Sequence, residues 1–231
     1  MLIGRGITSG YRGEPVLRDV AITVPDGVTV AILGPNGAGK STLFKTLIGL
    51  LPLQGGSVHV DELDISQMPP YRRVRAGLGY VPQLGRIFPS LSVRENLEMG
   101  GFTLTKELTD RIDTVLELFP DLRVAMKQSA SNLSGGQQTM LGMARALMLQ
   151  PKIMLLDEPT AGLSPLYAAK VWESIRNIAN AGIGVLTIEQ NVTFALEQSD
   201  QAYVLVNGQN TSHGRSSDLK GRSDVEGLFV G

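Results

Sequence analysis

Short apolar runs, separated by glycines, prolines and polar residues, recur before residue 82 and after residue 152. Their lengths and compositions predict β-strands at residues 16–24, 28–33, 78–81, 153–156 and 185–188. Pro25, Asp26 and Gly27 lie between the first two runs and are typical of a tight turn. We expect an antiparallel β region at the N-terminus.

Helical spacing of apolar residues follows several of these predicted strands. It predicts helices at residues 40–50, 106–118 and 136–149. Strands that alternate with helices are typical of a mostly parallel sheet covered by helices. The pattern therefore predicts the α/β fold class.

The strand pattern stops between Gln83 and Gln150, where helical segments replace it. This interval predicts an inserted helical subdomain. We therefore predict a single domain over residues 1–231, with the helical subdomain at 86–150 and the core divided between residues 1–85 and 151–231.

The charge balance and the amino-acid usage exclude several functions. The chain has 21 basic and 22 acidic residues, so no excess of positive charge is available to bind a nucleic acid backbone. It has no cysteine, which excludes disulfides, thiolate metal sites and cysteine nucleophiles and agrees with a cytoplasmic location. The longest apolar runs, such as residues 28–33, are too short to span a bilayer. We expect no direct membrane insertion, so any membrane association must come through a partner.

Residues 34–41 read GPNGAGKS, which fits the phosphate-loop pattern G-x-x-x-x-G-K-[ST] and lies between a predicted strand and a predicted helix. Backbone N–H groups of such a loop, together with the helix N-terminus, bind phosphates. Lys40 is expected to contact the outer phosphates, Ser41 to bind Mg²⁺ and Thr42 to contact an inner phosphate. A glycine-rich turn without a ligand is the alternative, and the strand and helix around it favour a P-loop NTPase core. The predicted nucleotide-binding residues are Gly34, Pro35, Asn36, Gly37, Ala38, Gly39, Lys40, Ser41 and Thr42.

Two carboxylates, Asp157 and Glu158, follow the apolar strand predicted at residues 153–156. Strand ends at the carboxyl edge of such a sheet bind ligands. Asp157 is expected to hold Mg²⁺, directly or through water, and Glu158 to polarise or deprotonate the attacking water. An acidic turn before Pro159 is the alternative, and only the phosphate loop makes the catalytic interpretation the better one.

Residues 133–137 read LSGGQ, between the two phosphate-site elements, and precede a predicted helix. This motif resembles the ABC ATPases. Ser134, Gly135 and Gly136 at a helix start form a second anion-binding site, and one nucleotide cannot use both sites of one small core. The resemblance implies a second ATPase subunit, packed head to tail, whose LSGGQ motif covers the γ-phosphate. Gln137 completes the motif, and an ordinary capped helix is the alternative.

The resemblance covers essentially the whole chain and implies roles for further residues. Tyr11 lies where the family has an aromatic residue that stacks on adenine, although a tyrosine in a turn can also serve packing or lie at the surface. Gln83 lies where the family senses the γ-phosphate and Mg²⁺, with a plain polar linker as the alternative. Gln190 stands where most members have a histidine that contacts the γ-phosphate. Gln190 can donate a hydrogen bond there but cannot carry a proton.

Three departures from the common family pattern are visible. Residues 162–164 read Gly-Leu-Ser instead of Ala-Leu-Asp, glutamine replaces histidine at position 190, and the segment LSGGQQTM at residues 133–140 lacks the basic residue that often follows the motif. Together with the segments 81–101 and 202–209, these departures resemble the importers of branched-chain amino acids or urea. In that subfamily two different ATP-binding subunits pair, and the sister subunit keeps the histidine.

The resemblance thus implies an Mg-ATP-hydrolysing subunit of an importer, most simply of branched-chain amino acids, located on the cytoplasmic face of the plasma membrane. Two transmembrane permease subunits would be its further partners, docked near Arg86, Ile87 and Phe88, although these residues could equally belong to the core of the helical subdomain. The alternatives are a urea or amide importer, a soluble ABC-type ATPase for protein or cofactor assembly, and a regulatory subunit without turnover. Glu158 argues against the last of these.

Overall fold

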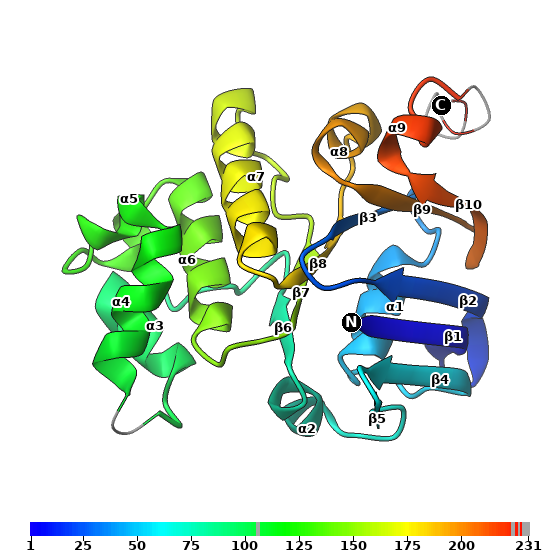
Figure 1. The fold of residues 1–231 in the computed structure, drawn as a ribbon, viewed down its shortest axis with the longest axis horizontal. Coiled ribbons are helices and arrows are strands. Elements are labelled where there is room, and N and C mark those ends of the chain that lie inside the picture. The colour runs from blue at the N-terminus through cyan, green and yellow to red at the C-terminus, as the bar shows by residue number, and fades with distance from the viewer. Residues whose placement is uncertain (105–106, 223–224, 226, 228–231) are drawn as a thin grey trace.

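Two β-sheets pack against helix α1 (Figure 1). The structure is a computed structural model that describes residues 1–104, 107–222, 225 and 227. In the first sheet every neighbouring pair is antiparallel, and the strand order is β2–β1–β4–β5. Its strands are β1 (Leu2–Tyr11), β2 (Glu14–Val24), β4 (Gly55–Val60) and β5 (Leu63–Asp64). The predicted antiparallel region at the N-terminus is confirmed.

The second sheet has the order β10–β9–β3–β8–β7–β6, in which only the edge strand β10 is antiparallel to its neighbour. Its strands are β3 (Thr29–Leu33), β6 (Leu78–Val81), β7 (Ile153–Asp157), β8 (Gly184–Ile188), β9 (Gln201–Val206) and β10 (Gln209–Arg215). Every residue of β3, β7 and β8 is buried. Strands covered on both faces form continuous apolar runs, which explains why the sequence predicts these strands well.

The turn at residues 25–27 joins strands of two different sheets, because β2 pairs with β1 and β3 pairs with β8 and β9. Polar and apolar residues alternate along much of β2, whereas β3 is buried throughout. The two strands joined by this turn therefore belong to different sheets and do not pair with each other.

Helix α1 (Lys40–Leu47) lies between the sheets, and its Leu43, Phe44 and Leu47 join one apolar cluster with residues of both. The helix ends before residue 50, where the sequence predicted its end. Gly49 has a φ of +84°, a left-handed conformation that stops the helix. The Arg73 side chain donates hydrogen bonds to the carbonyl oxygens of Thr46 and Leu47, at 2.8 and 2.7 Å.

Helices α3 to α6 gather beside α7 at one end of the molecule (Figure 1). Their apolar side chains form a second cluster with Trp172 and Ile175 of α7. Their bounds are α3 (Val93–Gly100), α4 (Leu108–Leu118), α5 (Pro120–Arg123), α6 (Gly135–Leu147) and α7 (Pro165–Asn180). The helix predicted at 106–118 begins at Leu108, and its residue 106 lies outside the described residues; the helix predicted at 136–149 ends at Leu147.

The remaining helices are short and lie between or after strands. They are α2 (Pro70–Arg75), the 3-10 helix at Ala130–Asn132, α8 (Val192–Gln198) and α9 (Ser216–Leu219). Among the residues that the structure describes, no helix has the length and the apolar character needed to cross a membrane.

Candidate active site

The phosphate loop connects β3 to α1, and two of its glycines are required by the backbone. A Cβ on Gly34 would lie 2.2 Å from the backbone oxygen of Leu205, so no side chain fits where the loop passes β9. Gly39 precedes α1 with a φ of +101°, which strains any residue with a side chain. These constraints direct the loop around the N-terminus of α1, where backbone N–H groups favour an anion.

Lys40 is buried and folds back over the loop that precedes it. Its Nζ donates hydrogen bonds to the carbonyl oxygens of Gly34 at 2.7 Å and Pro35 at 3.0 Å. Burial lowers the pKa of Lys40, and the charges of Glu158 and Asp157 oppose that shift. The lysine is therefore a pre-positioned cation next to two carboxylates.

The loop and the start of α1, together with residues of β1 and β2 and the residue after β7, line a cavity of about 330 Å³. Tyr11 contributes a ring that is 44% exposed, and the Lys45 Nζ lies 5.9 Å from its centroid. An exposed ring at the rim can stack on a planar base. The lining residues are Tyr11, Val16, Asn36, Gly37, Ala38, Gly39, Lys40, Ser41, Thr42 and Glu158.

The Glu158 carboxylate is held by two side-chain amides. The Nε2 atoms of Gln83 and Gln190 each donate a hydrogen bond of 2.6 Å to the same Oε2 atom. These residues follow β6, β7 and β8, which are adjacent parallel strands, so the sheet order brings them to one edge. Glu158 has a φ of +48°, a left-handed conformation that is costly for glutamate, and its N–H donates to the Ile188 oxygen at 3.1 Å.

Asp157 is 9% exposed and lies at the end of β7. Burial raises its pKa, and the neighbouring Glu158 raises it further, whereas Lys45 and a hydrogen bond from Tyr80 lower it. Burial, together with the Asp157 charge, raises the pKa of the Tyr80 phenol to about 12. Tyr80 is a site neighbour that the sequence analysis missed, because a tyrosine within a predicted strand carries no motif.

The oxygen donors around the cavity fit a magnesium ion. The Ser41 hydroxyl and the Asp157 carboxylate are hard ligands, and the Gln83 amide oxygen is a third candidate because its nitrogen binds Glu158. No cluster of three or more histidine, aspartate or glutamate side chains suited to a metal occurs among the described residues. Few protein ligands are expected where phosphates supply most of the coordination.

The LSGGQ segment begins α6 and is stabilised within its own chain. The Ser134 N–H donates to the Gln137 Oε1 at 3.0 Å, and the Gln137 N–H donates to the Ser134 Oγ at 3.4 Å, so the two form a capping box. A Cβ on Gly135 would lie 3.1 Å from Leu163, and one on Gly136 would lie 3.1 Å from Tyr167. The capped helix that the sequence analysis gave as an alternative is therefore present, and it leaves the glycines packed against the segment after Glu158.

The structure brings most of the predicted site residues together and keeps one group apart. Residues 36–42, Tyr11 and Glu158 share the cavity, and Gln83 and Gln190 contact Glu158. Residues 133–137 do not line this cavity, and α6 lies across α7 from α1 (Figure 1). Within one chain, therefore, the LSGGQ segment does not complete the phosphate site.

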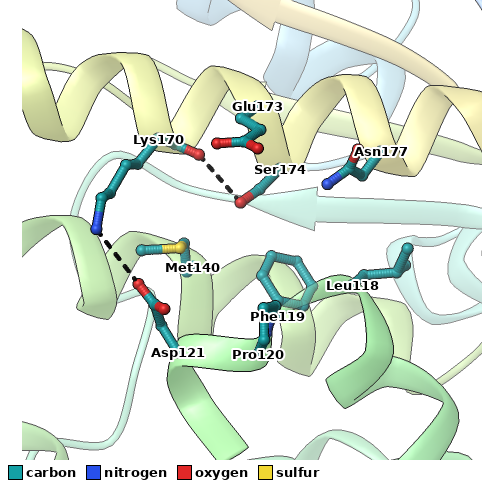
Figure 2. A pocket seen from close by; sticks show the side chains of 9 residues that line it. All are labelled: Leu118, Phe119, Pro120, Asp121, Met140, Lys170, Glu173, Ser174 and Asn177. Atoms are coloured by element: carbon teal, nitrogen blue, oxygen red, sulfur yellow. Dashed lines mark hydrogen bonds and ion pairs between the residues drawn. The ribbon is translucent and has the colours of Figure 1, made fainter.

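A separate cavity of about 240 Å³ lies between α7 and the segment around Phe119 (Figure 2). The Lys170 Nζ lies 3.7 Å from the Asp121 carboxylate across it, and both side chains are about half exposed. Such ion pairs contribute little free energy. None of the predicted site residues lines this cavity, so it is not part of the candidate active site.

The chain is similar in sequence to ATP-binding proteins of transporters. A family profile described as "ABC transporter" matches residues 17–161. The "Probable branched-chain amino acid transport ATP-binding protein LivF" of Archaeoglobus fulgidus is 40% identical over 227 residues, which are 97% of this chain and 96% of that protein. The "Lipopolysaccharide export system ATP-binding protein LptB" of Escherichia coli is 36% identical over 100% of this chain and 97% of that protein.

The fold also matches a solved structure over its whole length. A crystal structure described as the ADP conformation of MJ1267, an ATP-binding cassette of an ABC transporter, superposes with a TM-score of 0.92 and 28% identity. The match covers 100% of this chain and 98% of that one.

Proposed function

We propose that this chain, which belongs to the ABC transporter family of ATP-binding proteins, powers the import of branched-chain amino acids. The chain is the ATP-hydrolysing subunit of a transporter, as its family implies. The observation that carries the choice of cargo is its 40% identity to a relative named for branched-chain amino acid transport. A relative named for lipopolysaccharide export is 36% identical, so export of a lipid is the second candidate.

ATP would bind with its phosphates against the backbone N–H groups at the start of α1 and its base against the Tyr11 ring. Lys40, already held at the loop, would exchange its carbonyl contacts for phosphate oxygens. Ser41 and Asp157 would hold a magnesium ion, which neutralises phosphate charge when bound. The 330 Å³ cavity supports this arrangement, since all the predicted phosphate-contacting residues from Asn36 to Thr42 line it.

Hydrolysis requires a base at the γ-phosphate, and Glu158, which lines the same cavity as the phosphate loop, would serve as that base. Water attacks phosphorus while its proton passes to the Glu158 carboxylate, and the bond between the γ-phosphorus and the bridging oxygen breaks to give ADP and phosphate. The amides of Gln83 and Gln190 fix the carboxylate from two sides. On this mechanism position 190 acts by orientation, so glutamine can serve where a histidine is common.

A second ATPase subunit would complete the site. The LSGGQ helix start lies away from the phosphate loop of its own chain, and a helix N-terminus with free N–H groups binds anions. A head-to-tail partner would therefore receive this segment over its own nucleotide. We propose a sister chain with histidine at the position of Gln190 as that partner.

Apolar side chains exposed near residues 84–102 would dock the permease subunits. Leu84 is 82% exposed and Phe102 is 72% exposed, and Phe88 and Met99 are also exposed. Exposed apolar groups gathered on neighbouring segments favour a protein interface. Of residues 86–88, only Phe88 is exposed for docking. Ile87 packs on the core of the helical subdomain, and the Arg86 Nη1 donates a hydrogen bond to the Thr139 hydroxyl at 2.6 Å. Docking there would hold the chain at the cytoplasmic face of the membrane.

Purification of the tagged chain from detergent-solubilised membranes of its host, followed by identification of its partners, tests this function. We expect a second ATP-binding subunit and two multi-span proteins. Recovery of the chain without multi-span partners would indicate a soluble assembly ATPase and contradict the proposal.

The purified complex, placed in liposomes, then identifies the cargo. Uptake of labelled leucine, isoleucine and valine is expected with ATP, and uptake of urea or extraction of lipopolysaccharide would overturn the choice of cargo. Lys40→Ala should abolish ATP binding and uptake, whereas replacement of the exposed Lys127 by alanine should leave both unchanged.

A further inference from the structure

Glu189 is a buried carboxyl group that the proposed mechanism does not use. It follows β8, directly before Gln190, and is only 3% exposed. Its Oε2 accepts a hydrogen bond of 2.7 Å from the Thr160 hydroxyl. Its Oε1 is buried and has no hydrogen-bond partner among the described residues.

The two neighbours of this carboxyl both lead to Glu158. Gln190, the next residue, donates to the Glu158 carboxylate at 2.6 Å. Thr160 follows Glu158 by two positions, on the segment that joins β7 to α7. The Glu189–Thr160 hydrogen bond therefore closes a ring of contacts that contains Glu158, and the segment after it borders a cavity of about 270 Å³.

We propose that Glu189 is a positioning residue. It holds the segment after Glu158 against the end of β8 and so keeps the Glu158 carboxylate within hydrogen-bonding distance of the Gln190 amide. This inference rests on the proposed hydrolytic role of Glu158. It identifies a function for a residue that belongs to none of the motifs of the sequence.

The cost of burying this carboxyl supports a specific role. An apolar side chain would fill the same space without leaving an unpaired polar atom, which is unfavourable in the interior. Glu158 needs external support, since its left-handed backbone is unfavourable for a residue with a side chain. Two hydrogen bonds provide this support. The Glu158 N–H donates to the Ile188 oxygen in β8, and the Thr160 hydroxyl donates to the Glu189 carboxyl group directly after β8.

Steady-state ATPase kinetics of the assembled transporter test the proposal with the variants Glu189→Ala, Glu189→Gln, Thr160→Val and the Ala/Val double variant. We expect kcat to fall about 10-fold or more in Glu189→Ala and in Thr160→Val, with KM for ATP nearly unchanged. Glu189→Gln keeps an acceptor for Thr160 and should restore kcat to within about 3-fold of wild type. Because one contact is broken in either single variant, the double variant should be no slower than the singles.

Three results would overturn the inference: wild-type kcat in Thr160→Val, no rescue by Glu189→Gln, or losses that multiply in the double variant. Thr160→Val keeps the size of the side chain, so it remains informative if Glu189→Ala fails to fold. Ser174→Ala, which removes a hydroxyl in α7 away from the site, is the matched control. Glu158→Gln, measured in parallel, separates the two hypotheses, because retained hydrolysis there would contradict the proposed role of Glu158 as the base.

Discussion

Substitutions of Gln190 test whether the residue at this position acts by orienting the Glu158 carboxylate or by transferring a proton. Its amide contributes one of the two hydrogen bonds to the Glu158 Oε2. We expect Gln190→Ala to slow hydrolysis about 10- to 100-fold, roughly 1.4 to 2.7 kcal/mol, with ATP affinity little changed. Single-turnover hydrolysis and nucleotide binding measured on the same preparation check this.

Gln190→His is the matched comparison and should leave the site active or faster, because imidazole also donates a hydrogen bond. Two outcomes would contradict the orientation hypothesis. One is full activity in Gln190→Ala. The other is an almost silent Glu158→Gln change in the assembled complex, which would place most of the turnover in the sister subunit.

Glu189 should make the free energy of unfolding depend on pH. Burial raises its pKa from 4.5 to about 7, and the nearby Glu158 charge acts in the same direction. Between these values the native state keeps the proton and the unfolded chain loses it, so stability falls as the pH rises towards 7 and stays lower above it. The full penalty above pH 7 is on the order of 3 kcal/mol.

Glu189→Gln removes this titration. We therefore expect urea denaturation to show a stability difference, variant minus wild type, that increases by up to about 3 kcal/mol between roughly pH 5 and pH 8. A constant difference across this range would show that the buried carboxyl does not titrate there. Activity does not enter this measurement, so it is independent of the mechanism.

The sequence indicated the site residues through local motifs and a family resemblance, but it did not predict contacts that form only through the sheet. The phosphate loop is defined by spacing, and Glu158 by the apolar strand before it. The direct contact of Gln83 and Gln190 with Glu158 depends on the strand order β6–β7–β8, which no local pattern contains. Glu189 had one available signal, a charged residue at the end of an otherwise apolar strand.

At the scale of elements, α1 depends on a side chain from another helix. Arg73 of α2 is 2% exposed, and its guanidinium donates to carbonyl oxygens at the C-terminal end of α1 and in the segment before α2. The last carbonyls of a helix have no partner within the helix, and a positive charge near them is favourable. Arg73 therefore stabilises the helix that carries the phosphate loop.

Arg73→Met should destabilise the chain by about 3 kcal/mol or more, because several buried carbonyls lose their donor at once. Thermal and urea unfolding measure this. Arg75, an exposed arginine of the same helix, provides the control variant Arg75→Met, which should change stability by less than about 0.5 kcal/mol. Equal effects of the two substitutions would contradict the capping role.

The elements that the sequence analysis missed have weak or interrupted patterns. Strands β1 and β4 contain glycines that interrupt the apolar alternation, and β10 reads QNTSHGR, with no residue of the buried class. The end of α1 was placed too late, because residues 48–50 continue the apolar spacing while Gly49 and Arg73 stop the helix. Tertiary contacts decide such ends.

At the scale of the whole molecule, the separation of the LSGGQ segment from the phosphate loop predicts an ATP-dependent dimer. Glu158→Gln should bind ATP and stop hydrolysis, since it removes the proposed base and leaves Asp157 in place. ATP that is not hydrolysed stabilises the dimer in which both subunits contact it, so the variant should dimerise with itself or with the proposed sister subunit. Light scattering during size-exclusion chromatography, with ATP and Mg²⁺ in the running buffer, checks this.

The double variant Lys40→Ala/Glu158→Gln provides the control, because loss of nucleotide binding should return it to the monomer. A monomer of Glu158→Gln at saturating ATP would count against a shared site. A dimer without any nucleotide would show that the association has another cause.

The packing of Leu163 on Gly135 and of Tyr167 on Gly136 restricts how these two segments can evolve. A methyl group on either glycine would approach its neighbour to 3.1 Å, closer than carbon atoms normally pack, so a larger residue on one side requires a smaller one on the other. In sequences of this family, positions 163 and 167 should therefore covary with positions 135 and 136. A library randomised at these positions and selected for activity of the assembled transporter should recover matched pairs rather than independent preferences.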